Sequence, residues 1–224
     1  VVYVAITQSR AALCSGGFNY YDITDDTRQR ILKRLCNNET SVTYAVTVIS
    51  CIFAISSLEF KQHTTCQLLE FGFLEKLTTS MPTYDSLCLI SELASYSDRI
   101  KPRAIETQLV DTYLLPHIYS QELQLGALCC IYNIFRIRDS KNLFDDILIK
   151  RVISEFVNVC IAPRKKHYPV TNYCIYFFSC LSLTPKYRQW VQQYDKLLQF
   201  LRVNRHEFKD MKKHVNFILT SGCG

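Results

Sequence analysis

The reactive side chains that stand out in this sequence are its cysteines, which could bind a metal, form disulfides or simply pack. The chain of 224 residues contains 11 of them. His63 and Cys66 form one close pair, and Cys174 and Cys180 form a second, but no further ligands follow at the spacing of a zinc site. Free Cys in an apolar segment behaves as a small hydrophobic residue. We therefore expect structural cysteines, with no bound metal and no cofactor.

Sequence patterns of known catalytic sites are missing from the chain. It contains no G-x-S-x-G, no P-loop and no H-E-x-x-H. The acidic pairs Asp25 with Asp26 and Asp145 with Asp146 each precede a predicted helix, where the helix dipole favours negative charge. The histidines are scattered along the chain. We expect no catalytic residue and no enzymatic activity.

Basic residues gather at two places, and both could contact phosphate groups. The first is 164–167, inside a proline-bounded loop at 162–169, and the second is 212–214. The net charge is +6, below that of a typical nucleic-acid-binding domain. A solvated loop and a solvated helix face are therefore the favoured interpretation. The alternative function is a nucleic-acid-associated helical repeat protein that uses the loop 162–169.

Helical periodicity runs through most of the chain, and only 6 Gly and 6 Pro interrupt it. Over 27–36 the apolar residues fall on one face and the basic residues on the other, with Thr24, Asp25 and Asp26 as capping candidates. Thr40 or Ser41 can cap a second helix at roughly 41–58, which is apolar on nearly all sides and is expected between neighbours. The further predicted helices cover 64–71, 73–81, 84–96, 103–109, 112–119, 121–137, 141–160, 170–183, 193–203 and 205–220.

An internal repeat organises these helices. A cysteine followed by Ile or Leu inside an apolar helix recurs about every 40 residues, at Cys51, Cys88, Cys130 and Cys174. A second apolar cluster follows each of them. This pattern is typical of a helical repeat array and predicts one repeat domain over 1–224. The expected units are roughly 1–60, 61–99, 100–139, 140–184 and 185–224.

Two segments resemble armadillo repeats. The segment 66–77 resembles the junction between the first and second helices of a repeat, with Gly72 at the junction. The segment 126–134 resembles the third helix, in which small residues precede an apolar-x-Asn-apolar phrase. Thr112 and Asp195 stand at the junction position in two other units. The resemblance implies an all-α fold, a right-handed α-solenoid of about five repeats; HEAT repeats are the nearest rival.

Armadillo proteins that act as nuclear-import adaptors place a Trp, and one turn later an Asn, on each third helix. The corresponding Trp positions in this chain are Ser50, Cys88, Cys129 and Tyr176. The corresponding Asn positions are Ala54, Glu92, Asn133 and Cys180. Only Asn133 matches, and the sole Trp, Trp190, lies elsewhere. Peptide binding by this ladder is therefore not expected.

The stacked third helices are the expected partner-binding surface, because helical repeat arrays present extended surfaces to other macromolecules. Arg and Tyr are enriched at binding hot spots, so Arg136 and Tyr96 are the first residues to test. The expected function is a protein–protein interaction scaffold or adaptor that binds a partner protein or peptide within a larger assembly. The predicted partner-binding residues are Ser50, Glu92, Tyr96, Asn133, Arg136 and Tyr176.

The cysteine content also bears on the compartment. An odd number of cysteines without a compact secreted spacing indicates a reducing compartment, and we expect the cytoplasm. No apolar run reaches the ~18–20 residues of a membrane span. Residues 1–6 show no basic stretch and no cleavage site of a signal peptide. The chain lacks an initiator Met and ends in Ser-Gly-Cys-Gly, so we expect a segment of a longer protein.

Overall fold

The computed structural model of the chain describes residues 24–136, 144–162 and 168–220. Over these ranges the backbone forms helices and no strand, which confirms the all-α prediction. None of the helices in the described ranges is long and apolar enough to cross a membrane. The chain divides into two compact units, 1–103 and 104–224, and each is described by itself.

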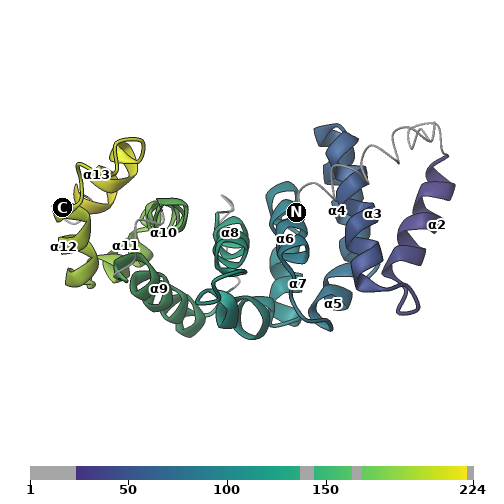
Figure 1. The fold of residues 1–224 in the computed structure, drawn as a ribbon, viewed down its shortest axis with the longest axis horizontal. Coiled ribbons are helices and arrows are strands. Elements are labelled where there is room, and N and C mark those ends of the chain that lie inside the picture. Colours follow the sequence, from purple (N-terminus) through teal and green to yellow (C-terminus); the bar gives the residue numbers. More distant parts are fainter. Residues whose placement is uncertain (1–23, 137–143, 163–167, 221–224) are drawn as a thin grey trace. The chain divides into compact units, whose positions relative to one another are not determined.

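From residue 24 onward, the first unit has two helices, followed by a helix, a tight turn, a short helix and a long helix (Figure 1). Its elements are α2 (Asp25–Cys36), α3 (Val42–Ile55), α4 (Leu58–Glu70), α5 (Phe73–Thr78), α6 (Tyr84–Tyr96) and α7 (Ile100–Glu106), the last of which extends into the second unit.

Hydroxyl side chains begin most helices of the first unit. The side chains of Thr24, Ser41 and Ser57 accept hydrogen bonds from backbone N–H groups in the first turns of α2, α3 and α4. Thr83 and Ser86 form a reciprocal capping box at the start of α6. Each cap satisfies a backbone donor that has no partner inside its helix. The predicted capping roles of Thr24 and Ser41 are confirmed.

The core of the first unit lies where α4 packs against α2, α5 and α6, and α3 packs against α6. Lys76 is an unusual member of this core, with a relative exposure of 5%. Its ammonium donates hydrogen bonds to the carbonyl oxygens of Leu35, at 2.7 Å, and Asn37. These carbonyls belong to the C-terminal end of α2, where the dipole favours a cation. The hydrogen bonds of Lys76 therefore link α5 to the C-terminal end of α2.

The second unit contains shorter and less regular elements before its long helices. A π-helix and a 3-10 helix replace one regular helix at its start, where Pro116 has no backbone N–H to donate. The elements are η2 (Leu109–Leu114), η3 (Leu115–His117), α8 (Gln124–Phe135), α9 (Asp146–Ile161), α10 (Tyr168–Leu181), α11 (Pro185–Gln192), α12 (Asp195–Val203) and α13 (Lys212–Thr220).

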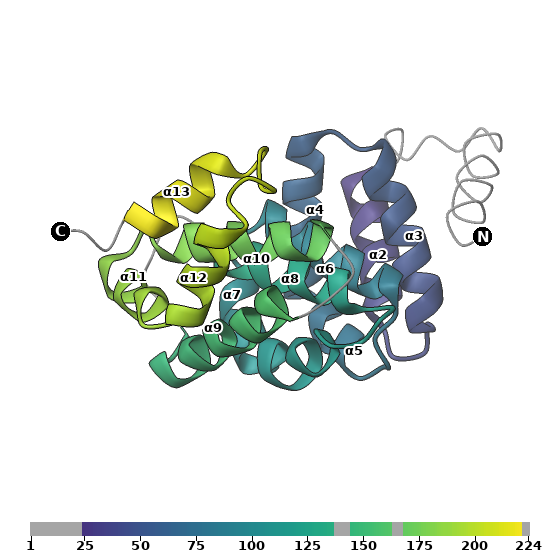
Figure 2. The ribbon, with the colours of Figure 1, turned by 60° about the vertical axis from the view of Figure 1, so that its left-hand side comes forward.

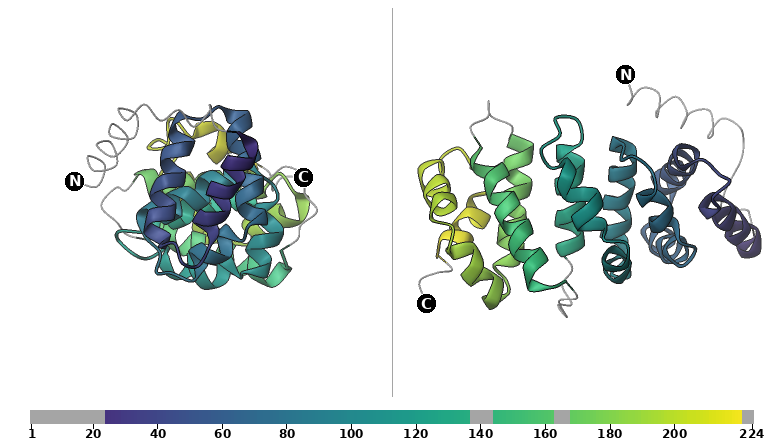
Figure 3. Two further views of the ribbon diagram at one scale, coloured as in Figure 1. Left: turned by 90° about the vertical axis from the view of Figure 1, so that its right-hand side faces the viewer. Right: turned by 90° about the horizontal axis from the view of Figure 1, so that it is seen from below.

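Helix α10 is the central element of the second unit. It contacts α8, α9, α11 and α13, and Figures 1 and 2 show it between α8 and α13. The packing of α9 along α10 is visible from below in Figure 3. Phe177 lies fully buried at this centre, with its ring centroid 4.1 Å from that of Phe156 and 5.8 Å from that of Phe135. Aromatic burial of this kind is a large part of a domain's hydrophobic stabilisation.

The repeated order of elements is clear in the described ranges. A helix, a tight turn, a second helix and a longer third helix occur as α4–α5–α6 and again as α7–η2/η3–α8. The backbone is left-handed at Gly72, with φ of 74°, before α5, and at Gln108, with φ of 50°, before η2. Thr112, which the resemblance placed at the junction position, lies within η2, and the left-handed residue of this segment is Gln108, one turn earlier. Part of 141–160, the loop core 163–167 and residues 1–6 lie outside the described ranges.

Several predicted helix boundaries are also wrong. The second helix ends at Ile55 rather than at 58, because Ser57 caps the next helix, so α4 begins at Leu58 and not at 64. The last helix begins at Lys212 rather than at 205. Complete burial of the second helix is likewise not observed, since Tyr44 on α3 has a relative exposure of 61%.

Candidate interaction surface

The predicted partner-binding residues lie on the long helices to which the sequence pattern assigned them. In the first unit Ser50 lies on α3, and Glu92 and Tyr96 lie on α6. In the second unit Asn133 lies on α8, Arg136 directly follows it, and Tyr176 lies on α10. Within the second unit, Arg136 and Tyr176 both lie against the ring of Tyr132, which is not among the predicted residues.

Three tyrosines form the centre of the candidate site. The ring of Tyr132, on α8, lies 6.1 Å from that of Tyr173 and 6.0 Å from that of Tyr176, centroid to centroid, and both partners lie on α10. The Arg136 guanidinium lies 6.0 Å from the centre of the Tyr132 ring, one helical turn along the same chain segment. Tyr176 retains a relative exposure of 36%. The cluster thus combines a cation with aromatic rings that solvent can partly reach.

The third helix of the site is α13, which contributes His214. The imidazole lies 5.0 Å from the ring of Tyr176 in an edge-to-face arrangement. Its Nδ1 lies 2.9 Å from the hydroxyl of Ser179, which is itself buried on α10. These two contacts orient the imidazole against α10. We call the surface formed by Tyr132, Arg136, Tyr173, Tyr176 and His214 the tyrosine face.

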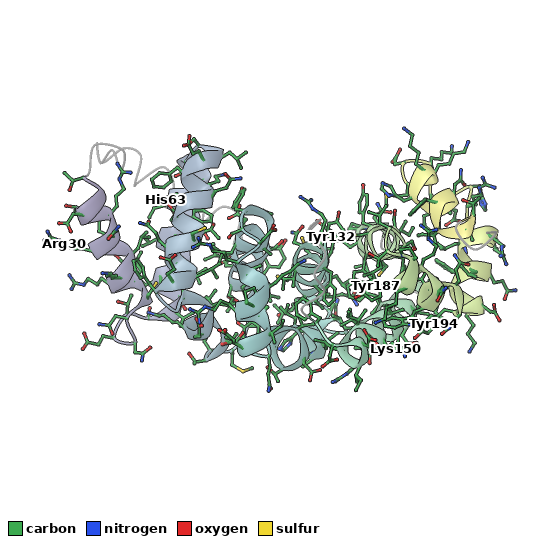
Figure 4. All side chains as sticks on the ribbon, turned by 180° about the vertical axis from the view of Figure 1, so that it is seen from behind. Arg30, His63, Tyr132, Lys150, Tyr187 and Tyr194 are labelled. Carbon is green, nitrogen blue, oxygen red and sulfur yellow. The ribbon has the colours of Figure 1, made fainter. Side chains whose placement is uncertain are left out.

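Burial determines the protonation of Tyr132. Removal from water raises the pKa of its phenol, and the hydrogen bond and the charge of Arg136 oppose that rise only in part. The phenol is therefore neutral at physiological pH and keeps its proton for hydrogen bonding. In Figure 4 the labelled Tyr132 lies above the labelled Lys150 of the same unit.

Asn133 sits next to the tyrosine face but is oriented by its own helix. Its amide Nδ2 donates to the sulfur of Cys129 at 3.8 Å, one turn earlier on α8. Cys180, on α10, in turn contacts the carbonyl oxygen of Phe135 at 3.9 Å. The Cys180 contact therefore joins α10 to α8, whereas the Asn133 contact stays within α8.

The predicted residues of the first unit have a different environment. The ring of Tyr96 packs edge to face against buried Phe53, at 5.9 Å. The Lys61 ammonium lies 5.4 Å from the centre of the Tyr96 ring and donates to its hydroxyl at 3.4 Å. Ser50 and Glu92 are half-buried. Tyr96, which is also half-buried, thus joins α6 to α3 and α4.

A second aromatic cluster in the second unit involves Trp190 on α11. The ammonium groups of Lys150 and Lys186 lie 4.7 Å and 5.3 Å from its ring centre, and Lys186 also pairs with Asp146 at 2.6 Å. Burial and the Asp146 charge raise the pKa of neighbouring Tyr187. Lys150 lies towards the lower margin of the second unit in Figure 4, away from Tyr132. The contacts of Lys150 with Trp190 and of Asp146 with Lys186 link α9 to α11.

Sequence reasoning missed Tyr132, Tyr173 and His214. The two tyrosines have a local signal, because Tyr132 precedes Arg136 by one turn and Tyr173 precedes Tyr176 by one turn. His214 has no such signal, since its place depends on how α13 packs against α10.

In the described ranges, no group of three or more His, Cys, Asp or Glu residues is placed so that it could hold a metal ion. Nine cysteines in those ranges are free thiols. Of the two close pairs noted in the sequence, Cys66 instead contacts the hydroxyl of Ser97 at 3.6 Å.

Comparison with known proteins gives no further assignment. No protein-family model matches the sequence, and no curated protein matches it. The functional proposal therefore rests on the residues and geometry described above.

Proposed function

We propose that this chain is a non-catalytic protein-interaction module, built as a right-handed α-solenoid of about five armadillo-like repeats. Two features support the repeat assignment: the recurring order of a helix, a tight turn, a helix and a longer helix, and the left-handed residues at Gly72 and Gln108. The module would act as a scaffold or adaptor of the cytoplasm, within a larger assembly.

The tyrosine face is the observation on which the proposed function depends. Partly exposed Tyr beside Arg is the composition of protein-binding hot spots, because both side chains offer large contact areas and directional hydrogen bonds. Tyr132 and Arg136 come from α8, and Tyr173 and Tyr176 come from α10. A partner segment that crosses these two helices would cover the Tyr176 ring and accept hydrogen bonds from Arg136.

Site-specific photo-crosslinking tests this function. A photoreactive phenylalanine derivative at position 176 samples the tyrosine face, and the same residue at position 119 is a matched control. Tyr119 is also an exposed tyrosine of the second unit, but it hydrogen-bonds to Glu155 on α9 at 2.5 Å. We expect a defined protein adduct from position 176 in cells and much less from position 119. Equal adducts from both positions, or none from 176, would refute the proposal.

A further inference from the structure

The helices of the tyrosine face share a charge property that bears on the class of partner. Neither α8, α10 nor α13 contains an aspartate or a glutamate. Cationic residues occur at their ends, with Arg136 after α8 and with Lys212 and Lys213 in the first turn of α13, next to His214. Because α10 contacts both α8 and α13, the three helices form one patch within the second unit, and no acidic residue of the patch lies on the helices themselves.

Among the residues that the structure describes, the cations of this patch have no acidic ion-pair partner. In the described part of the chain no carboxylate forms an ion pair with Arg136, Lys212 or Lys213, and all three side chains are exposed. Cations elsewhere in the same unit behave differently: Arg151 pairs with Asp111, and Lys186 pairs with Asp146. Two acidic residues of the unit, Asp111 and Asp146, thus pair with cations on other elements.

The position of the two lysines is also unfavourable for their own helix. The N-terminal turn of a helix favours acidic side chains, and α13 has none there. Lys212 and Lys213 therefore add positive potential to the patch at a small cost in helix stability. Uncompensated charge of one sign over a patch attracts ligands of the opposite sign.

We propose that the tyrosine face binds an acidic segment of its partner protein, in which Asp or Glu residues alternate with aromatic or aliphatic residues. The proposal rests on the protein-interaction function inferred above and names the partner class. A partner carboxylate would accept the hydrogen bonds of the Arg136 guanidinium, which suits planar bidentate pairing. An adjacent apolar side chain would pack on the rings of Tyr176 and His214.

The arrangement of the rings favours a protein segment over a nucleic acid. Single-stranded nucleic acids need successive aromatic platforms on which bases stack. Here the rings of Tyr132 and Tyr173 are turned edge to face towards each other, and both are half-buried. Tyr176 remains the most exposed ring of the three, which suits one apolar side chain of a peptide.

Fluorescence anisotropy on the complete chain tests the partner class. The probe is a labelled dodecapeptide in which Glu alternates with Leu and Tyr, and its control has Gln at every Glu position. We expect the Glu peptide to bind at least about tenfold more tightly than the Gln peptide. The double variant R136E/K213E should lose about tenfold in affinity for the Glu peptide. In this variant, two cations that attract the peptide's carboxylates are replaced by carboxylates that repel them.

The matched control variant is K196E/R202E, which changes net charge equally but alters exposed residues of α12. Its affinity for the Glu peptide should stay within about twofold of the wild-type value. A circular dichroism melt would confirm that both variants remain folded. If the Gln peptide binds as tightly as the Glu peptide, or if neither binds, the acidic partner class is wrong.

A third probe, an oligouridylate of the same length, separates the protein class from nucleic acid. Tighter binding of the oligouridylate than of the Glu peptide, lost in R136E/K213E, would overturn the proposal in favour of nucleic acid. The proposed interaction function is judged separately, by the crosslinks from position 176. A defined protein adduct there whose crosslinked segment is neutral or basic would refute the acidic class and leave that function standing.

Discussion

Cys36 and Lys76 show what burial does to single side chains in the first unit. Burial raises the pKa of the Cys36 thiol from 9.0 to about 12, and the nearby Lys76 charge opposes that rise only in part. Burial also lowers the pKa of Lys76. Both groups lie where α2 ends and α5 begins, so their titration reports on that junction.

The Cys36 shift predicts a loss of stability at alkaline pH. A raised folded pKa means that the unfolded chain releases the thiol proton first, so stability falls as pH rises from about 9 to about 12. Between pH 8 and pH 10 the wild-type free energy of unfolding should fall by roughly 1.4 kcal/mol more than that of Cys36→Ala. Urea titrations at both pH values measure this difference, and parallel losses in the two proteins would show that Cys36 is not buried as described.

Some residues of the candidate site could be predicted from the sequence, and others could not. Tyr176 and Arg136 followed from their register on apolar long helices, since periodicity identifies the faces of a helix. Their partner His214 could not be predicted, because it depends on the tertiary packing of α13 against α10. Tyr96 was predicted at an interface position, and it packs largely within its own unit against Phe53.

At the scale of elements, the turns before α5 and η2 have the same backbone conformation but different residues. Gly72 adopts a left-handed φ without steric cost. Gln108 adopts the same conformation although its Cβ is strained there. A Cβ at Gly72 would meet Glu75 Oε2 at 3.6 Å, an ordinary contact, so only the backbone conformation resists a side chain there.

Reciprocal substitutions test these two turns. Gly72→Ala should reduce the free energy of unfolding by about 1–2 kcal/mol, because alanine is strained in the left-handed region. Gln108→Gly should increase it by about 0.5–1 kcal/mol, since relief of strain exceeds the added chain entropy.

The control for these substitutions is Gln62→Gly, at an exposed position inside α4, where glycine should cost about 1 kcal/mol. Chemical unfolding of the three variants gives the comparison. A destabilised Gln108→Gly variant would contradict the left-handed turn.

The helices were largely predictable, and the reasons are local. The ends of α6 followed from the turn at Pro82 and the polar loop after Tyr96, and the start of α3 followed from Ser41. The π-helix at η2 was not predictable, because its apolar spacing resembles that of an ordinary helix. The left-handed Gln108 was missed for a similar reason, since only glycine signals that conformation in a sequence.

At the scale of the whole molecule, the proposed solenoid has a consequence for size. A compact globule of this length has a radius of gyration of about 17 Å. A solenoid buries its core only between neighbouring repeats, so we expect about 20 Å or more and a skewed pair-distance distribution. Small-angle X-ray scattering measures both quantities. A symmetric distribution with a radius near 17 Å would contradict the solenoid.

The central claim is that a partner protein binds at the tyrosine face, and the crosslinking yield at position 176 relative to position 119 tests it most directly. We expect a ratio of about ten or more, because few interface positions dominate binding. We also expect the yield at 176 to fall when Arg136→Ala removes the neighbouring cation. A ratio near one, unchanged by Arg136→Ala, would contradict the claim.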